Sequence, residues 1–400
     1  MTFDTEISDI YSADLLGFGE PTHLEPAFAW TRNELFAESA GRGFRSIALE
    51  TDRVAALVVD DYVRDGVGTL EGAMRAGFSH GFGEVAANEQ LVAWMREYNE
   101  NRPAEERLAF YGFDAPMETM SAPSPRTYLE HARDYLGLDH DVAGPAGADE
   151  RWYRTEAVLD SAESPGATNE AGVLRVLADD MLTELYVRAP ELVAKTSRAE
   201  WVRAETYLTA GIGMLRYHRQ AAQPTGQEAR WTRMCATRDA LMAQNLLDIR
   251  RIEAGRGATL VFAHNLHLQR NTSRMRMGDM DLEWHSAGAV VGSLLGSRYS
   301  VVIGSLGRDE TIGMPEPAAG TYEGFLQGRV TTRELIAPTE IPAATTRLDH
   351  TPAHGYFPLE RETVDAADAI LHIHNGAAYR DGSAALFPAS VRDAEESLGR

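Results

Sequence analysis

Short apolar runs recur along the chain, and most of them stop at a polar residue or a turn. They cover residues 15–19, 46–49, 108–113, 259–263, 301–303 and 369–373. The runs are too short for independent helices, and most lack strict alternation of apolar and polar positions. They therefore predict strands that are buried on both faces, as in a parallel sheet. In the last run, the alternation of His372 and His374 favours the polar face of an edge strand.

Segments with apolar residues at helical spacing lie between these runs. Residues 25–40 place Phe28 and Leu35 in such a pattern, and glycines follow as a stop signal. Residues 52–64 and 86–98 are further predicted helices. The alternation of strands and helices predicts an α/β fold with a mostly parallel central sheet flanked by helices.

Residues 119–235 depart from this alternation. Gly, Pro, Asp and Ala are frequent in residues 137–172, which predicts a loop. Residues 173–190 and 198–222 have the pattern of amphipathic helices. We predict that this part of the chain is a helical insertion subdomain that walls a cleft.

The rest of the chain, residues 1–118 and 236–400, forms the predicted α/β core. A length of 400 residues is long for one domain, which agrees with a core that carries an insertion. Within the second part of the core, residues 306–358 are rich in Pro, Gly and Thr and predict irregular structure.

Polar residues repeatedly end the predicted strands. Glu20, Glu50, Asp114 and His264 each follow directly on an apolar run. Because ligands of open α/β sheets bind outside the carboxyl ends of the strands, these positions indicate a site at one edge of the sheet.

The turn after the first run, residues 19–23, has the sequence GEPTH. The ordinary pKa of a histidine suits proton transfer near neutral pH, and Glu20 could orient His23 for that task. The turn could equally cap the next helix through Thr22 and leave His23 merely exposed. Glu50 ends a buried strand and needs a partner there, unless it serves as a charge at a helix N-terminus.

Residues 264–267 have the sequence HNLH, again directly after a run. His264 and His267 could converge on one ligand, as metal ligands or as donors to an oxyanion, or they could have a structural role. Arg32 lies in the helix after the first motif, close to its apolar side, where it joins the site or extends to the surface.

Several catalytic and cofactor-binding motifs are absent from the sequence. Ile303 stands where a G-x-S-x-G nucleophile elbow over residues 303–307 would need glycine. There is no HExxH, P-loop or CxxC motif, and residues 17–19, GFG, lack the third glycine of a dinucleotide fingerprint. We therefore expect no cofactor. The single cysteine, Cys235, is expected to be a small buried residue and not a nucleophile.

The charge balance restricts the class of partner. Sixty acidic and 38 basic residues give a formal charge of −22, which argues against nucleic acid and anionic membranes. No apolar run is long enough to span a bilayer, and the N-terminus lacks the pattern of a signal peptide. We expect a cytoplasmic protein that acts on a small molecule, and the sequence does not indicate an oligomeric state.

These motifs, in this order, resemble the erythromycin esterase family. GEPTH is similar to the family's G-E-x-T-H signature, with Arg32 nine residues after the histidine and Glu50 at the end of the next strand. Residues 94–99, 111–114, 238–243 and 263–267 resemble further family segments. Taken alone, Trp94 and Arg238 would indicate ordinary helix packing. Pro21 and residues 78–83 depart from the family pattern, which bears on the substrate.

The resemblance implies an α/β core, a helical subdomain and a cleft between them. It also implies that His23 is a general base. Around this base it places Glu20, Glu50, Arg32, His264 and His267. We expect Asp114 and Asn265 to contact the substrate. The implied reaction is metal-independent hydrolysis of an ester or lactone, with a macrolide or a related natural product as candidate substrate.

Other functions are compatible with the same residues. The same base could deprotonate a substrate hydroxyl for cyclisation or acyl transfer. His23, His264 and His267 with a carboxylate could instead bind a catalytic metal ion, although Arg32 in the cluster would repel it. A binding protein with a decayed site is the remaining alternative. The intact cluster of charged residues argues against decay.

Overall fold

The computed structural model describes residues 8–118 and 120–379. Over these residues a seven-stranded sheet has the order β3-β2-β4-β1-β7-β9-β8. Its strands are β1 (Leu15–Glu20), β2 (Phe44–Asp52), β3 (Ala109–Asp114), β4 (Ala258–His264), β7 (Tyr299–Arg308), β8 (Arg333–Ile336) and β9 (Ala369–Asn375). All neighbouring strands are parallel except β8, which pairs antiparallel with β9. The predicted mostly parallel α/β sheet is therefore confirmed.

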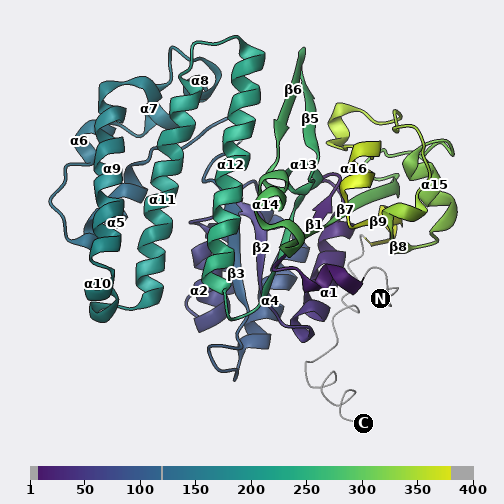
Figure 1. The fold of residues 1–400 in the computed structure, drawn as a ribbon, viewed down its shortest axis with the longest axis horizontal. Coiled ribbons are helices and arrows are strands. Elements are labelled where there is room, and N and C mark those ends of the chain that lie inside the picture. The colour runs from purple at the N-terminus through teal and green to yellow at the C-terminus, as the bar shows by residue number, and fades with distance from the viewer. Residues whose placement is uncertain (1–7, 119, 380–400) are drawn as a thin grey trace.

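Helices cover both faces of the sheet (Figure 1). One face packs against α1 (Pro26–Gly41), α2 (Ala56–Asp65) and α4 (Ala86–Asn99). The other packs against α12 (Gln227–Glu253), α14 (Ala287–Leu295), α15 (Tyr322–Arg329) and α16 (Arg361–Ala366). Successive side chains of β1 show this division, because Leu15 joins the second cluster and Leu16 the first. Apolar burial on both faces explains why the strands read as unbroken apolar runs.

The inserted part of the chain forms a separate helical layer, at the left of Figure 1. Its main helices are α5 (Arg126–Leu136), α9 (Asn169–Val187), α10 (Ala189–Lys195) and α11 (Arg198–Ala221). They enclose a hydrophobic cluster of their own around Trp152 and Met181. Helix α12 stands between this layer and the sheet, so the predicted boundary at residues 235/236 falls inside a continuous helix.

Some segments differ from their sequence-based prediction. The predicted loop 137–172 contains the short helices α6 (Ala143–Ala146), α7 (Glu150–Tyr153) and α8 (Thr155–Leu159). The predicted irregular segment 306–358 includes α15 and β8. The antiparallel hairpin β5 (Thr272–Met277) and β6 (Met280–His285), helix α3 (Leu70–Ala76) and helix α13 (Asn265–Leu268) were not predicted.

The prediction for the last strand was wrong in one respect. Strand β9 is not an edge strand, because β8 pairs along its outer side. His372 is fully buried under α15, and its ring nitrogens face Ser305 Oγ of β7 and Gln327 Oε1 of α15. In the described part of the chain, no helix is both long and apolar enough to cross a bilayer.

Candidate active site

The predicted site residues meet where three neighbouring strands end. Strands β2, β4 and β1 are adjacent in the sheet, and Glu20 on β1 is in register with His264 on β4. Glu50 lies near the end of β2, on the other side of β4. Parallel pairing thus brings Glu20, Glu50 and His264 to one edge, as predicted from their positions after the apolar runs.

The turn after β1 presents His23. Glu20 Oε1 accepts a hydrogen bond of 2.7 Å from His23 Nδ1. Thr22 does not cap helix α1. Its hydroxyl donates to the His354 carbonyl instead, and the N-cap of α1 is Glu25, whose carboxylate accepts from the Ala27 amide. The turn is thus fixed on both sides of His23.

The second ring nitrogen of His23 is available. Nε2 makes no hydrogen bond with a described residue and lies 3.8 Å from Glu50 Oε1. The side chain is 37% exposed, and its ring packs against Phe82 with the centroids 5.3 Å apart. Burial opposes a charge on the ring, but Glu50 and Glu20 outweigh it and raise the pKa of His23 to about 9.

A cavity of about 350 Å³ opens beside His23. Besides His23, its polar wall consists of Glu20, Glu25, Arg32, Glu50 and Asn88. The apolar wall consists of Leu24, Pro26, Ala29, Leu49, Phe82, Val85, Phe262 and Ala263. Convergent polar groups in a mostly apolar cavity are the usual arrangement of a small-molecule site.

Arg32 is a buried cation in the wall of this cavity. It is 1% exposed, and no carboxylate of the described residues lies within ion-pair distance of it. Its guanidinium donates to the Asn33 and Asn88 side-chain oxygens and lies over the Phe262 ring. Burial lowers the pKa of Arg32 to about 9, although Glu20 acts in the opposite direction. A buried guanidinium that faces a cavity is suited to an anionic group.

Glu50 lies at the centre of the cluster. Its Oε2 accepts from the His264 backbone amide at 2.8 Å, and Oε1 lies 3.3 Å from His267 Nε2 and 3.4 Å from Arg238 Nη2. Burial alone would raise its pKa, but the charges of His267, His23 and Arg238 lower the pKa of Glu50 to about 2. Glu50 is therefore a carboxylate throughout the physiological range.

His267 is held between two carboxylates. Its Nδ1 donates to Asp239 Oδ1 at 2.9 Å, while Nε2 faces Glu50. Asp239 also accepts from Trp284 Nε1 and from the Ala287 amide, so its orientation is fixed. Burial disfavours a charged His267, but Asp239 and Glu50 outweigh this and raise its pKa. Both nitrogens face carboxylates, an arrangement that favours the imidazolium form of His267.

His264 has the opposite state. The Leu266 amide donates to its Nδ1 at 3.1 Å, so the ring proton resides on Nε2, which donates to the Pro21 carbonyl. Burial and the charge of His23 lower the pKa of His264 to about 3. Its ring packs edge-on against His23, with the centroids 5.2 Å apart. His264 is therefore neutral and fully hydrogen-bonded.

The predicted substrate contacts, Asp114 and Asn265, are occupied by protein groups. Asp114 is fully buried and accepts from Arg238 and from His80 Nε2. Burial would raise its pKa, but Arg238 and His80 hold the pKa of Asp114 well below its usual range. The Asn265 amide donates to the Gly304 carbonyl and accepts from the Gly304 amide, which fastens the end of β4 to β7.

Residues that had not been assigned to the site complete it. Arg238 and Asp239 lie on α12, and only their place in a family-like segment signalled them. His80, with a positive φ of 58°, donates to Asp114 and to Glu118 Oε2. No periodicity or spacing in the sequence indicated His80 or Glu118.

Metal ligands and the single cysteine also bear on the chemistry of the site. Among residues 8–118 and 120–379, no group of three or more His, Cys, Asp and Glu side chains is arranged to hold a metal ion. Cys235 is half-buried, and burial raises the pKa of its thiol to about 11, which disfavours the thiolate.

Several solved structures have a similar fold. A protein from Bacillus cereus has a TM-score of 0.64 and 16% identity, over 93% of this chain and 91% of its own. A mutant of the erythromycin esterase EreC in its open conformation has a TM-score of 0.62 and 17% identity, over 92% and 91%. A succinoglycan biosynthesis protein has a TM-score of 0.62 and 14% identity, over 92% and 89%. At these identities the likeness shows the fold.

The sequence comparisons identify the family. No curated protein matches the chain. The model of the family described as erythromycin esterase matches residues 40–394, a range that contains Glu50, Arg238, His264 and His267 and begins after His23. Membership supports a hydrolase of the esterase type. The chain belongs to the erythromycin esterase family.

Proposed function

We propose that this protein hydrolyses an ester or lactone without a metal ion, with His23 as the general base. One observation carries the proposal. His23 Nδ1 is held by Glu20, whereas Nε2 has no hydrogen bond with a described residue and lies beside a cavity. A histidine oriented through one nitrogen and open at the other is the arrangement that general-base catalysis requires.

In the proposed reaction, water attacks the substrate carbonyl carbon directly. Neutral His23 takes a proton from the water at Nε2 while the new carbon–oxygen bond forms, and Glu50 orients the water. The tetrahedral intermediate then collapses, the bond to the alcohol oxygen breaks, and the imidazolium of His23 returns its proton to that oxygen. The products are an acid and an alcohol, and no acyl-enzyme forms.

Arg32 is the proposed partner of the developing oxyanion. It lines the cavity and has no ion-pair partner among the described residues. A single donor in such a position contributes about 3–4 kcal/mol in comparable sites. The charged His267 is then a positioning residue that fixes Glu50, because its nitrogens face Glu50 and Asp239.

The remaining predicted site residues are proposed to act through others. His264 supports the ring of His23 and the Pro21 carbonyl of its turn. Asp114 holds Arg238 beside Glu50, and Asn265 fixes the strand end. These roles replace the expected substrate contacts of Asp114 and Asn265, because both side chains already bond protein groups.

We propose a natural-product lactone or ester as substrate. Family membership and the fold shared with the erythromycin esterase EreC favour this class. The cavity of about 350 Å³ lies at the lower end of the roughly 300–1,000 Å³ that is typical of ligand pockets. It is suited to the ester-bearing part of a large substrate.

The test begins with erythromycin and simple esters, screened by mass spectrometry for products that have gained one water. Single turnover of a hit in heavy-oxygen water should place the label in the product acid, with no covalent adduct on the intact protein. A trapped acyl adduct on Ser, Thr or Cys would exclude direct attack by water. An unlabelled product of unchanged mass would replace hydrolysis by cyclisation, with the same base.

A further inference from the structure

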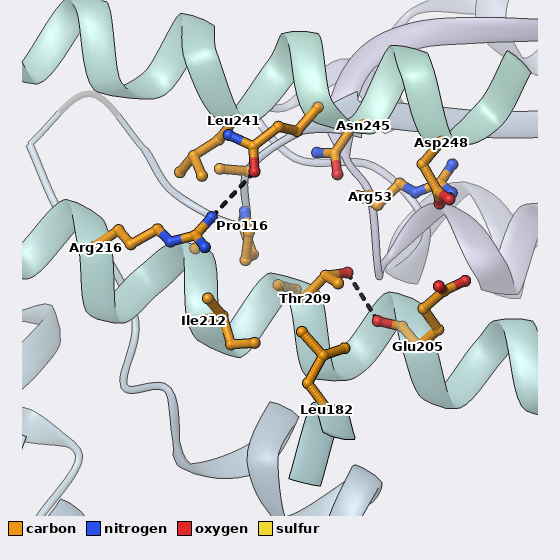
Figure 2. Close-up of a pocket in the computed structure, with 14 residues that line it drawn as sticks. Arg53, Pro116, Leu182, Glu205, Thr209, Ile212, Arg216, Leu241, Asn245 and Asp248 are labelled. Atoms are coloured by element: carbon orange, nitrogen blue, oxygen red, sulfur yellow. Dashed lines mark hydrogen bonds and ion pairs between the residues drawn. The ribbon is translucent and has the colours of Figure 1, made fainter. Parts of the chain in front are cut away.

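A second cavity, of about 240 Å³, lies between the helical layer and the core. Figure 2 shows it between α11 and α12, with Leu182 of α9 below and Pro116, which follows β3, behind. Its residues are not those of the cavity beside His23. The proposed hydrolysis leaves this cavity without a role.

A nearly buried arginine forms one wall of this cavity. The side chain of Arg53 is 4% exposed, and its guanidinium bonds Asp248 Oδ2 at 2.9 Å and lies over the Tyr111 ring. That bond uses one of its five N–H donors. Arg216, an exposed residue on α11, lies elsewhere on the wall and donates to Gln244 Oε1 (Figure 2).

The two carboxylates of the wall, Glu205 and Asp248, already form ion pairs with another arginine. Arg251 forms ion pairs with both Glu205 and Asp248, and the Tyr186 hydroxyl also donates to Glu205. The lining itself holds two arginines and two carboxylates, and Arg251, which lies outside the lining, supplies a third positive charge beside the carboxylates. Arg53 and Arg216 therefore favour an anion in the cavity.

The rest of the wall is largely apolar. Leu182, Ala210, Ile212 and Leu241 project toward the cavity from three different helices, and Pro116 closes it on the sheet side. A ligand with a single anionic group and an apolar body would match both parts of the wall. The volume lies below the usual range of drug-sized pockets, which limits the body to a short chain or one ring.

We propose that this cavity is a second binding site, which takes a small carboxylate with an apolar body, its carboxylate on Arg53. The two cavities share no lining residue, but a backbone hydrogen bond joins their surroundings. The Arg53 amide donates to the Asp114 carbonyl at 3.0 Å, while the Asp114 carboxylate faces Arg238 and His80 on the other side.

The test is calorimetric titration of the whole protein with octanoate, and with octanamide as the neutral analogue. Octanoate should bind, and octanamide should bind about tenfold or more weakly, since the charge-assisted hydrogen bonds are lost. Arg53→Gln should weaken octanoate binding by a similar factor. Arg75→Gln, an exposed arginine on α3, is the matched control and should leave binding unchanged.

A second variant fills the cavity without removing a charge. The three atoms nearest to a Cβ at Gly213 all belong to the Leu241 side chain, at 3.4 to 4.0 Å, and Gly213 lines the cavity, so Gly213→Phe should abolish octanoate binding, with circular dichroism to establish that the variant is folded. The matched control is Gly172→Phe on α9, where a Cβ would meet nothing within 4 Å. No octanoate binding by the wild type, or binding that both Arg53→Gln and Gly213→Phe leave unchanged, would overturn the proposal. Because no turnover is measured, neither result bears on the hydrolase proposal.

Discussion

The turns after β1 and β4 bring histidines to the same place under different constraints. The strands are neighbours, and the rings of His23 and His264 lie 5.2 Å apart. In the first turn the histidine is partly exposed and has one nitrogen open. In the second, His264 and His267 are largely buried, and each nitrogen faces a backbone group or a carboxylate.

The difference shows that hydrogen-bond occupancy decides what each histidine can do. Adjacent His23 and His264 have pKa values shifted in opposite directions, to about 9 and about 3. Glu20 and Glu50 favour the charged form of His23. Burial and the charge of His23 disfavour the charged form of His264. In the proposed hydrolysis, the turn after β1 transfers the proton and the turn after β4 positions the groups around it.

The largest expected effect comes from removing the base. His23→Gln should lower the hydrolysis rate by about 100-fold or more, because general-base catalysis typically contributes about 10²–10⁴. Single-turnover rates on an ester or lactone found in the screen would measure it, with circular dichroism to establish folding. A folded variant with a rate near that of wild type would contradict the role of His23.

A smaller loss of hydrolysis rate is expected when His267, in the turn after β4, loses the carboxylate that orients it. Asp239→Asn removes the carboxylate that holds His267, and a hydrogen bond to a charged group is worth about 1.5–3 kcal/mol, or roughly 10- to 150-fold. The rate at saturating substrate should fall within that range. Cys235→Ser, one turn earlier on the same helix, should have little effect. Equal rates for both variants would contradict a positioning role of His267.

Substitution in the turn after β4 should cost more stability than substitution in the turn after β1, the reverse of the order expected for the rate. His264→Ala leaves the buried Leu266 amide and Pro21 carbonyl without their partner, which should lower the free energy of unfolding by about 1–3 kcal/mol. His23→Gln keeps a donor for Glu20 and should change it by less than about 1 kcal/mol. Urea unfolding of both variants measures the difference. A greater loss for His23→Gln would mean that His23 is the structural residue.

Much of the fold could be predicted because its cause is local. Strands buried on both faces leave unbroken apolar runs, and amphipathic helices leave a stripe. The β5–β6 hairpin also leaves a local signal, because exposed charges such as Arg274 and Glu283 alternate with buried residues such as Leu282, but the prediction relied on unbroken apolar runs. Strand β9 was assigned to an edge because nothing in the sequence indicated that β8 would pair with it.

The site residues also divide into those with a local signal in the sequence and those that depend on tertiary packing. The rule that ligands bind at strand ends predicted Glu20, Glu50 and His264, because it needs only the ends of the runs. Arg238 and Asp239 belong to α12, whose rotation over the sheet depends on packing that no single segment encodes. The occupancy of each ring nitrogen is likewise a tertiary property, so strand position alone did not distinguish His23 from His264, and only the family resemblance predicted His23 as the base.

The pH dependence of kcat/KM for wild type and Glu20→Gln tests the central claim most directly. The base acts when neutral, so the wild-type value should rise with pH and level off above the pKa of His23, about 9. Glu20 helps to raise that pKa, so Glu20→Gln should move the rise to lower pH. A wild-type value that falls between pH of about 6 and 9, or a rise that Glu20→Gln leaves in place, would contradict a proton transfer to His23.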